Sequence, residues 1–205
     1  MEFSNKQRNR GFTLVELLIV IGLLAILTTV TILVLNPVQL FAQARDATRL
    51  SDLDTINSAL AYYLSTASST TVDLDAAVAN GCTTYCFTHV AEATAGSNCG
   101  SRHAALGKET ELNSSDRDVD GTGWIPVDIR NSTGGPPISN YPVDPSSTSS
   151  YFYDYTCDNS NFTYELDANM ESVRYAYQGS DDVESTDGGN SATIYEVGTD
   201  PGLDL

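Results

Sequence analysis

An uncharged apolar stretch close to the N-terminus, Leu17–Leu35, constrains the fold of this chain more than any other feature. The apolar run begins at Phe12 and is interrupted only by Glu16. A helix over Leu17–Leu35 is about 28 Å long, which is close to the hydrocarbon thickness of a bilayer. Basic residues lie just before the run, within residues 1–11. The positive-inside rule therefore predicts that residues 1–11 stay in the cytoplasm while the rest of the chain crosses the membrane.

The remainder of the chain is strongly acidic and contains all four cysteines. The formal net charge is -17. Residues 51–205 hold five basic and 24 acidic residues. Such a surface repels phosphate backbones, so we expect no direct binding to nucleic acid. The composition, which is rich in Ser, Thr, Asn, Gly and Tyr, favours an exported domain in which disulfides persist.

Two ordinary readings of the N-terminus remain open. A secretory signal peptide would be cleaved after Ala44, since Ala42-Gln43-Ala44 supplies an A-x-A pattern, and would release a soluble domain. An uncleaved signal anchor would instead tether an extracellular binding module that is never polymerised. The apolar run is longer than the core of a usual signal peptide, which argues against the first reading.

The stretch Arg10–Leu18, with the sequence RGFTLVELL, closely resembles the processing motif of prepilins. These are the precursors of type IV pilins and of type II secretion pseudopilins. The resemblance implies that a prepilin peptidase cuts after Gly11 and methylates the new N-terminal amine of Phe12. It also implies that Glu16, the fifth residue of the mature chain, acts in filament assembly.

Glu16 is informative without the resemblance as well. A carboxylate inside a membrane helix costs on the order of 2.5–3.5 kcal/mol on insertion scales, so it usually marks a function and needs a partner. The resemblance supplies one, the N-terminal amine of Phe12 in a neighbouring subunit. Such a buried pair would fix the axial register of the subunits, because leaving one member alone costs about 3–5 kcal/mol. The alternative is that Glu16 only reaches the membrane interface near the helix end.

A long helix should continue beyond the membrane segment. Pro37 predicts a kink, since proline removes one helical hydrogen bond. Beyond it, an apolar stripe at spacings of three and four extends to Leu64. We expect an α+β, type IV pilin-like fold, in which this helix packs on a small antiparallel sheet with long loops. The expected segments are a leader (1–11), a membrane or filament-core half-helix (12–36), an amphipathic half-helix (37–66) and an extracytoplasmic domain (67–205).

The outer domain offers three strand-like segments. Trp124–Ile129 is one, at a sheet edge because of Pro126. Tyr151–Thr156 and Phe162–Leu166 predict a hairpin over residues 151–166, with its turn at Asp158–Asn161. The acidic, Gly-rich tail, residues 179–205, predicts loop.

The cysteines predict two disulfides among Cys82, Cys86, Cys99 and Cys157. Our preferred pairing is Cys82–Cys86 with Cys99–Cys157, although four cysteines allow three connectivities. A zinc site is the alternative, because histidines lie among the cysteines at positions 89 and 103.

A calcium site is the cofactor that the sequence suggests. Asp116, Asp118 and Asp120 open a D-x-D-x-D-G loop, in which alternate carboxylates can converge on one cation. The match is partial, because the twelfth position is Val127 rather than glutamate. A second acidic candidate lies at Asp181, Asp182 and Asp187.

No catalytic constellation is present in the sequence, so we expect a structural subunit rather than an enzyme. Its partners would be copies of itself in a helical filament, the prepilin peptidase, and a membrane assembly platform with its ATPase. It would span the cytoplasmic membrane once before assembly and then lie in an extracellular or cell-surface filament. The sequence does not distinguish a pilus from a pseudopilus. Arg45, Asp46 and Arg49 are read either as subunit-to-subunit salt bridges or as a solvated helix face.

Overall fold

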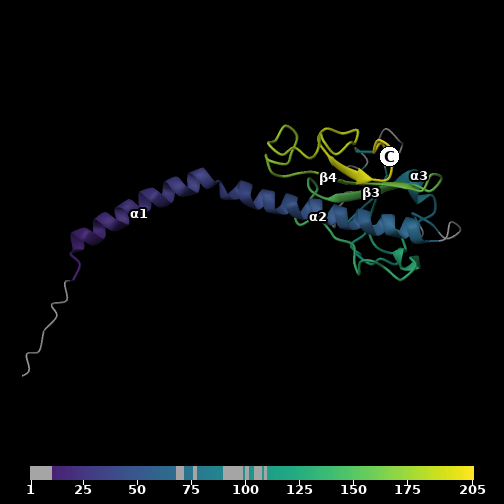
Figure 1. Cartoon of the computed structure of the whole chain (residues 1–205), viewed down its shortest axis with the longest axis horizontal. Helices are drawn as coiled ribbons and strands as arrows, with labels where there is room; N and C mark the ends of the chain where they lie inside the picture. The colour runs from purple at the N-terminus through teal and green to yellow at the C-terminus, as the bar shows by residue number, and fades with distance from the viewer. Residues whose placement is uncertain are drawn as a thin grey trace, which may run out of the picture. The chain divides into compact units, whose positions relative to one another are not determined.

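The computed structural model describes residues 11–67, 72–75, 78–89, 99, 102–103, 108 and 110–205. The chain divides into two compact units, Met1–Leu40 and Phe41–Leu205. The first unit holds the N-terminal helix, and the second, called the outer unit below, holds the sheet (Figure 1).

The expected long helix forms as two helices. Helix α1 covers Leu14–Leu35 and α2 covers Pro37–Thr66. Asn36 between them has a left-handed backbone, with φ of 40°. Asparagine tolerates this conformation, and proline suits the first position of a new helix because its missing N–H would be unpaired there. The interruption predicted at Pro37 therefore falls one residue earlier, at Asn36.

The outer unit contains a five-stranded sheet in the order β2-β1-β3-β4-β5. The strands are β1 (Tyr85–Thr88), β2 (Thr110–Asn113), β3 (Tyr153–Asp158), β4 (Thr163–Ala168) and β5 (Tyr195–Gly198). The α+β, pilin-like fold class is confirmed. The sheet is mixed rather than wholly antiparallel, since β1 and β2 run parallel. A short helix, α3 (Gly81–Thr84), precedes β1.

Helix α2 packs on the sheet through its predicted apolar stripe. Leu53, Ile56, Leu60 and Tyr63 are all buried in the main core. The strands contribute tyrosines whose rings pack in this core, and the hydroxyls of Tyr153 and Tyr164 bond to the helix. Tyr153 Oη, for example, donates to the Asp52 carboxylate at 3.0 Å. The tyrosines thus join the two layers by both apolar contact and hydrogen bonds.

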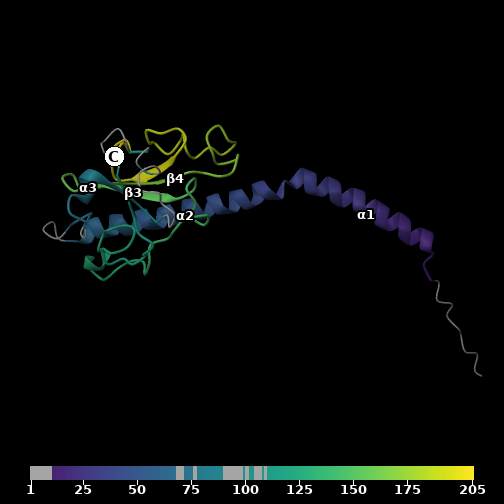
Figure 2. The ribbon, with the colours of Figure 1, turned by 180° about the vertical axis from the view of Figure 1, so that it is seen from behind.

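The segment from about residue 115 to 140 covers α2 on the side away from the sheet (Figures 1 and 2). Trp124, Ile125, Val127 and Ile129 are fully or almost fully buried there. The predicted strand at Trp124–Ile129 is wrong, because this segment is irregular and ends in a 3₁₀ turn, η2 (Ile129–Asn131). The apolar residues of this segment are buried against α2 and do not form a strand of the sheet.

The predicted hairpin is present, two residues later than expected. Strands β3 and β4 pair antiparallel from Tyr153↔Ala168 to Asp158↔Thr163. The acidic tail also contributes structure, since β5 pairs with β4 at the edge of the sheet.

Asp46 and Arg49 are neither a solvated face nor free for another subunit. The Arg49 side chain is completely buried and pairs with Asp46 at 2.7 Å and with Asp144 at 2.6 Å. Arg45 forms an ion pair with Glu171. Both expectations are therefore wrong for Asp46 and Arg49, which are buried and paired within the chain, whereas Arg45 is partly exposed.

Candidate functional site

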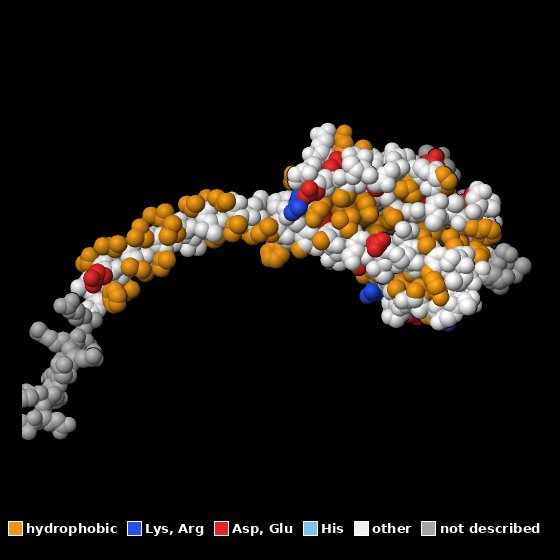
Figure 3. Space-filling view, viewed as in Figure 1, with side chains coloured by type: hydrophobic (Ala, Val, Ile, Leu, Met, Phe, Trp, Pro, Cys, Tyr) orange, Lys and Arg blue, Asp and Glu red, His pale blue; other side chains and the backbone are white. Residues whose placement is uncertain are grey.

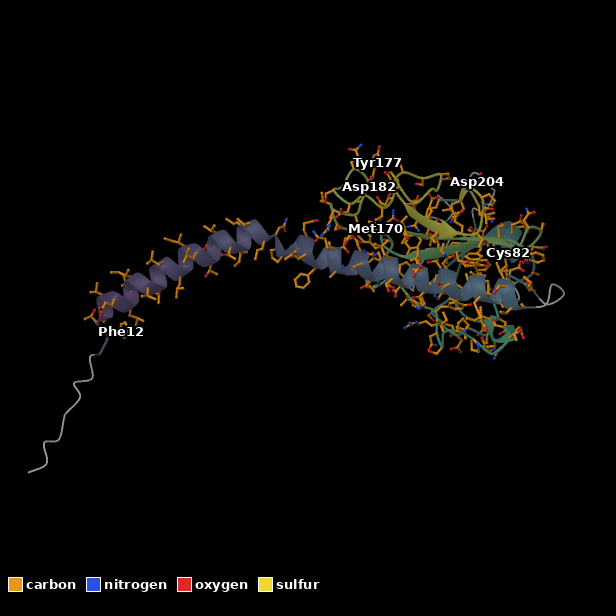
Figure 4. The ribbon with its side chains drawn as sticks, viewed as in Figure 1. Phe12, Cys82, Met170, Tyr177, Asp182 and Asp204 are labelled. Atoms are coloured by element: carbon orange, nitrogen blue, oxygen red, sulfur yellow. A yellow bond between two sulfur atoms is a disulfide. The ribbon has the colours of Figure 1, made fainter. Side chains whose placement is uncertain are left out.

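The first turn of α1 and the residues just before it were predicted from the sequence to act in processing and assembly. Phe12 lies at the start of α1 and is 88% exposed (Figure 4). Gly11 is also exposed, and a Cβ added to it would meet no atom within 4 Å. The peptide bond between Gly11 and Phe12 is therefore accessible on its glycine side. The roles of Gly11 and Phe12 in cleavage and methylation stay predictions.

Glu16 and Thr13 cap the N-terminus of α1. The Glu16 carboxylate accepts the Thr13 N–H at 2.8 Å and the Thr13 hydroxyl at 2.9 Å. The Glu16 N–H donates in return to the Thr13 hydroxyl oxygen at 3.2 Å. This capping box satisfies N–H groups that a helix leaves unpaired at its start. The carboxylate thus has partners within its own chain, one turn from Phe12.

The surface of α1 is apolar along its entire length and is exposed everywhere (Figure 3). Glu16 is its only charged residue. The hydroxyls of Thr28, Thr29 and Thr31 each donate to the carbonyl four residues earlier, which removes these donors from the surface. Among the described residues, one helical stretch is long and apolar enough to cross a membrane, with a mean hydropathy of 2.9 in its best window.

The predicted calcium loop does not bring its carboxylates together. Among the described residues, one group of three metal-ligating side chains lies within 4.8 Å, and it contains none of Asp116, Asp118 and Asp120. Asp120 instead accepts from Thr122 and lies 3.7 Å from Arg130. The second calcium candidate, at Asp181, Asp182 and Asp187, forms no such group among the described residues either. Asp181 instead pairs with Arg174.

All four cysteines form disulfides, in a pairing that differs from the preferred one. Cys82 bonds to Cys157 and Cys86 bonds to Cys99. The first bond joins α3 to β3 beside the main core (Figure 4). The zinc alternative is excluded, because no free cysteine is left among the described residues.

The two histidines, which the sequence offered only as ligands of the alternative zinc site, lie in different surroundings. The Nε2 of His89 is 3.1 Å from the Ser115 carbonyl oxygen. His103 is buried beside Asp154 and Asp167, at 2.8 and 3.2 Å. Burial opposes its positive charge, but the two carboxylates outweigh burial and raise the pKa of His103 to about 11. The cluster of carboxylates around His103 could not be identified from the sequence.

The fold and the N-terminal segment together define a class. A bare apolar helix with one acid in its first turn leads into an amphipathic helix packed on a small sheet, as in pilin-like proteins. Residues 6–32 match the family model of the prokaryotic N-terminal methylation motif. This motif is the hallmark of type IV pilin and pseudopilin prepilin-like proteins, which are structural subunits, and the chain carries it. No curated protein and no solved structure matches the chain.

Proposed function

We propose that this chain is a prepilin that is cleaved after Gly11, methylated on Phe12 and polymerised into a type IV pilus or a type II secretion pseudopilus. The observation that carries the proposal is the surface of α1, which is apolar on every side and holds a single carboxylate in its first turn. Such a helix needs either lipid or other apolar helices around it.

Polymerisation would surround α1 first with lipid and then with other apolar helices. Before assembly, α1 lies in the membrane, and its internal hydrogen bonds satisfy its backbone there. After assembly, the α1 helices of many subunits bundle and exchange lipid contacts for contacts with one another. The exposed side chains of Val38, Leu40 and Phe41 extend this apolar surface into the start of α2.

Glu16 gives the bundle its register. In the single chain its carboxylate is held by Thr13, which lowers the cost of waiting in the membrane. Cleavage would create a positive amine on Phe12, one turn away. In a filament that amine can approach Glu16 of a neighbouring subunit, and the pair neutralises two charges where water is scarce.

The intact mass of the protein recovered from its native cell tests the processing step. We expect a chain of residues 12–205 plus one methyl group. An uncut chain would support a tethered binding module instead. A chain that begins after Ala44 would support a secreted domain, although that cut falls inside α2, ahead of residues buried in the outer unit.

Replacement of Glu16 tests the assembly step. Glu16→Ala leaves a buried amine without its partner, at a cost of about 3–5 kcal/mol per subunit, so filaments should be lost. Cleavage and methylation should continue, because the peptide bond at Gly11 is unchanged. Asp204→Asn, which removes an exposed carboxylate of the outer unit, is the matched control and should assemble normally. Normal filaments from Glu16→Ala would refute the role in register.

A further inference from the structure

Four buried carboxylates gather on the face of the sheet that is turned away from α2. Side chains alternate along a strand, so the core tyrosines of β3 and β4 face the helix while their neighbours face the other way. The register places one acid from each of three adjacent strands directly side by side, and a fourth lies two positions along β4. These acids, called the acidic cluster below, are Asp154, Asp167, Glu196 and Glu165.

The segment at residues 102–103 lies over this cluster. Arg102 forms an ion pair with Asp154, and its guanidinium stacks over the Phe152 ring at 4.0 Å. His103 places its Nε2 2.8 Å from Asp154 and 3.2 Å from Asp167. Among the described residues, no other ion pair reaches the acidic cluster within 4.0 Å. Carboxylates therefore outnumber their cations.

Within the acidic cluster, Asp167 holds the buried carboxylate oxygen that is left without a hydrogen-bond partner among the described residues. Its Oδ1 atom is buried and has no hydrogen-bond partner, and the residue is only 1% exposed. A buried carboxylate without compensation must take up either a proton or a cation.

The orientation of His103 is that of a metal-binding histidine. Its Nδ1 lies 2.5 Å from the Leu205 main-chain oxygen, so Nδ1 carries a proton and donates it. Its Nε2 points at oxygens of Asp154 and Asp167, so without a metal ion Nε2 also carries a proton and the ring is positively charged. A metal ion bound at Nε2 would take the place of this proton. Histidines that bind metals usually donate their other ring N–H to a carboxylate or a main-chain oxygen.

We propose that His103, Glu165 and Asp167 form a binding site for a divalent transition metal ion, Zn²⁺ being the best fit. One ligand atom from each lies within 4.8 Å of the others. Two ligands of a tetrahedral zinc ion are about 3.3 Å apart, given metal–ligand bonds of about 2 Å. The separation of 3.2 Å between His103 Nε2 and Asp167 Oδ2 matches this spacing.

The donor set argues for the ion class. Calcium prefers six to eight oxygen ligands, whereas one imidazole with two carboxylates suits zinc and its neighbours. The ion would be structural, because it would fix the 102–103 segment to β4. The Cys86–Cys99 disulfide anchors the same region. The main-chain N–H of His103 donates to the Cys99 carbonyl oxygen at 3.2 Å.

Calorimetry on the full-length chain tests the proposal. The protein is kept in detergent with its disulfides intact, carries no polyhistidine tag, and is stripped with a chelator before titration with ZnCl₂. We expect one zinc per chain, with a heat that changes with the buffer, because the ion displaces a proton from the cluster. No stoichiometric binding, binding without proton release, or a preference for Ca²⁺ would overturn the proposal.

Variants then locate the site. His103→Gln and Asp167→Asn should each weaken zinc binding by at least about 100-fold, since each removes one of three ligands. His89→Gln and Asp54→Asn are the matched controls and should bind zinc as the parent does. Parent-like affinity in His103→Gln or Asp167→Asn would exclude this site.

A measurement on the unaltered chain covers the case in which a ligand variant fails to fold. The chain has two histidines, so long-range ¹H–¹⁵N spectra contain two imidazole systems, and His89→Gln assigns them. Zinc should remove the proton from Nε2 of His103 and shift that nitrogen, while His89 stays unchanged. A His103 signal that does not respond to bound zinc would refute the assignment.

Discussion

At the scale of single residues, this chain stabilises charges in apolar surroundings in two different ways. Arg49 is buried in the outer unit, and its guanidinium donates to Asp144, Asp46 and Ser146. These partners replace the hydrogen bonds that water would make to the guanidinium, so the positive charge of Arg49 can be buried. Glu16 has only the groups of its own first turn. The first arrangement is complete within one chain, whereas the second would gain a charged partner from another copy in the proposed filament.

Arg49→Met should destabilise the outer unit by about 3–5 kcal/mol, since it leaves the buried carboxylates of Asp46 and Asp144 without their cation. The fluorescence of Trp124, the one tryptophan and a buried residue, reports this unfolding in denaturant. Arg130→Met is the matched control. Its pairs with Asp120 and Asp128 are exposed, so its loss should cost less than about 1 kcal/mol. Equal losses from the two variants would contradict the reading of Arg49.

At the scale of elements, the sequence predicted those helices and strands that the local periodicity of apolar residues determines. The apolar run gave α1, the stripe ending near Leu64 gave α2, and aromatic alternation gave the β3–β4 hairpin. Pairing between distant segments was not predictable in this way. The parallel contact of β1 with β2, the disulfide pairing and the burial of Trp124–Ile129 against α2 all depend on which segments meet in space.

The acidic cluster illustrates the same limit within the candidate sites. Alternation of acids with apolar residues in β3 and β4 was visible in the sequence, and it normally indicates a solvated face. Only the fold reveals that residues 102–103 and the end of the chain lie over that face and bury it. The N-terminal motif, in contrast, is contiguous in the sequence and could be identified without the fold.

The two disulfides should differ in their contribution to stability. Cys82–Cys157 joins residues 75 apart in sequence, whereas Cys86–Cys99 joins residues 13 apart. By loop-closure entropy, removal of the first bond should cost about 4.5 kcal/mol and removal of the second about 3 kcal/mol. Paired alanine variants of each bond, unfolded in denaturant, measure the difference. Peptide mapping without reduction checks the pairing itself, and recovery of a Cys82–Cys86 peptide would contradict it.

At the scale of the whole molecule, charge is segregated along the chain. Helix α1 holds one charged residue, and residues 51–205 hold 24 acidic residues against five basic ones. A single chain in the membrane tolerates this excess, because its outer unit is surrounded by water and counterions. A filament is different, since it brings many copies of the same acidic unit close together.

Filament stability should therefore depend on ionic strength, a prediction that rests on the proposed polymerisation. The screening length is about 8 Å at 0.15 M salt and about 30 Å at 0.01 M, so repulsion between neighbouring outer units extends much further in dilute salt. The sedimentable fraction of purified filaments should fall when salt is lowered over this range. A variant with three exposed acids neutralised, Asp54→Asn, Asp116→Asn and Asp118→Asn, should tolerate lower salt than the parent. If parent and variant instead dissociated alike at every salt concentration, repulsion between outer units would not limit assembly, and apolar packing of α1 together with the Glu16 pair would set filament stability alone.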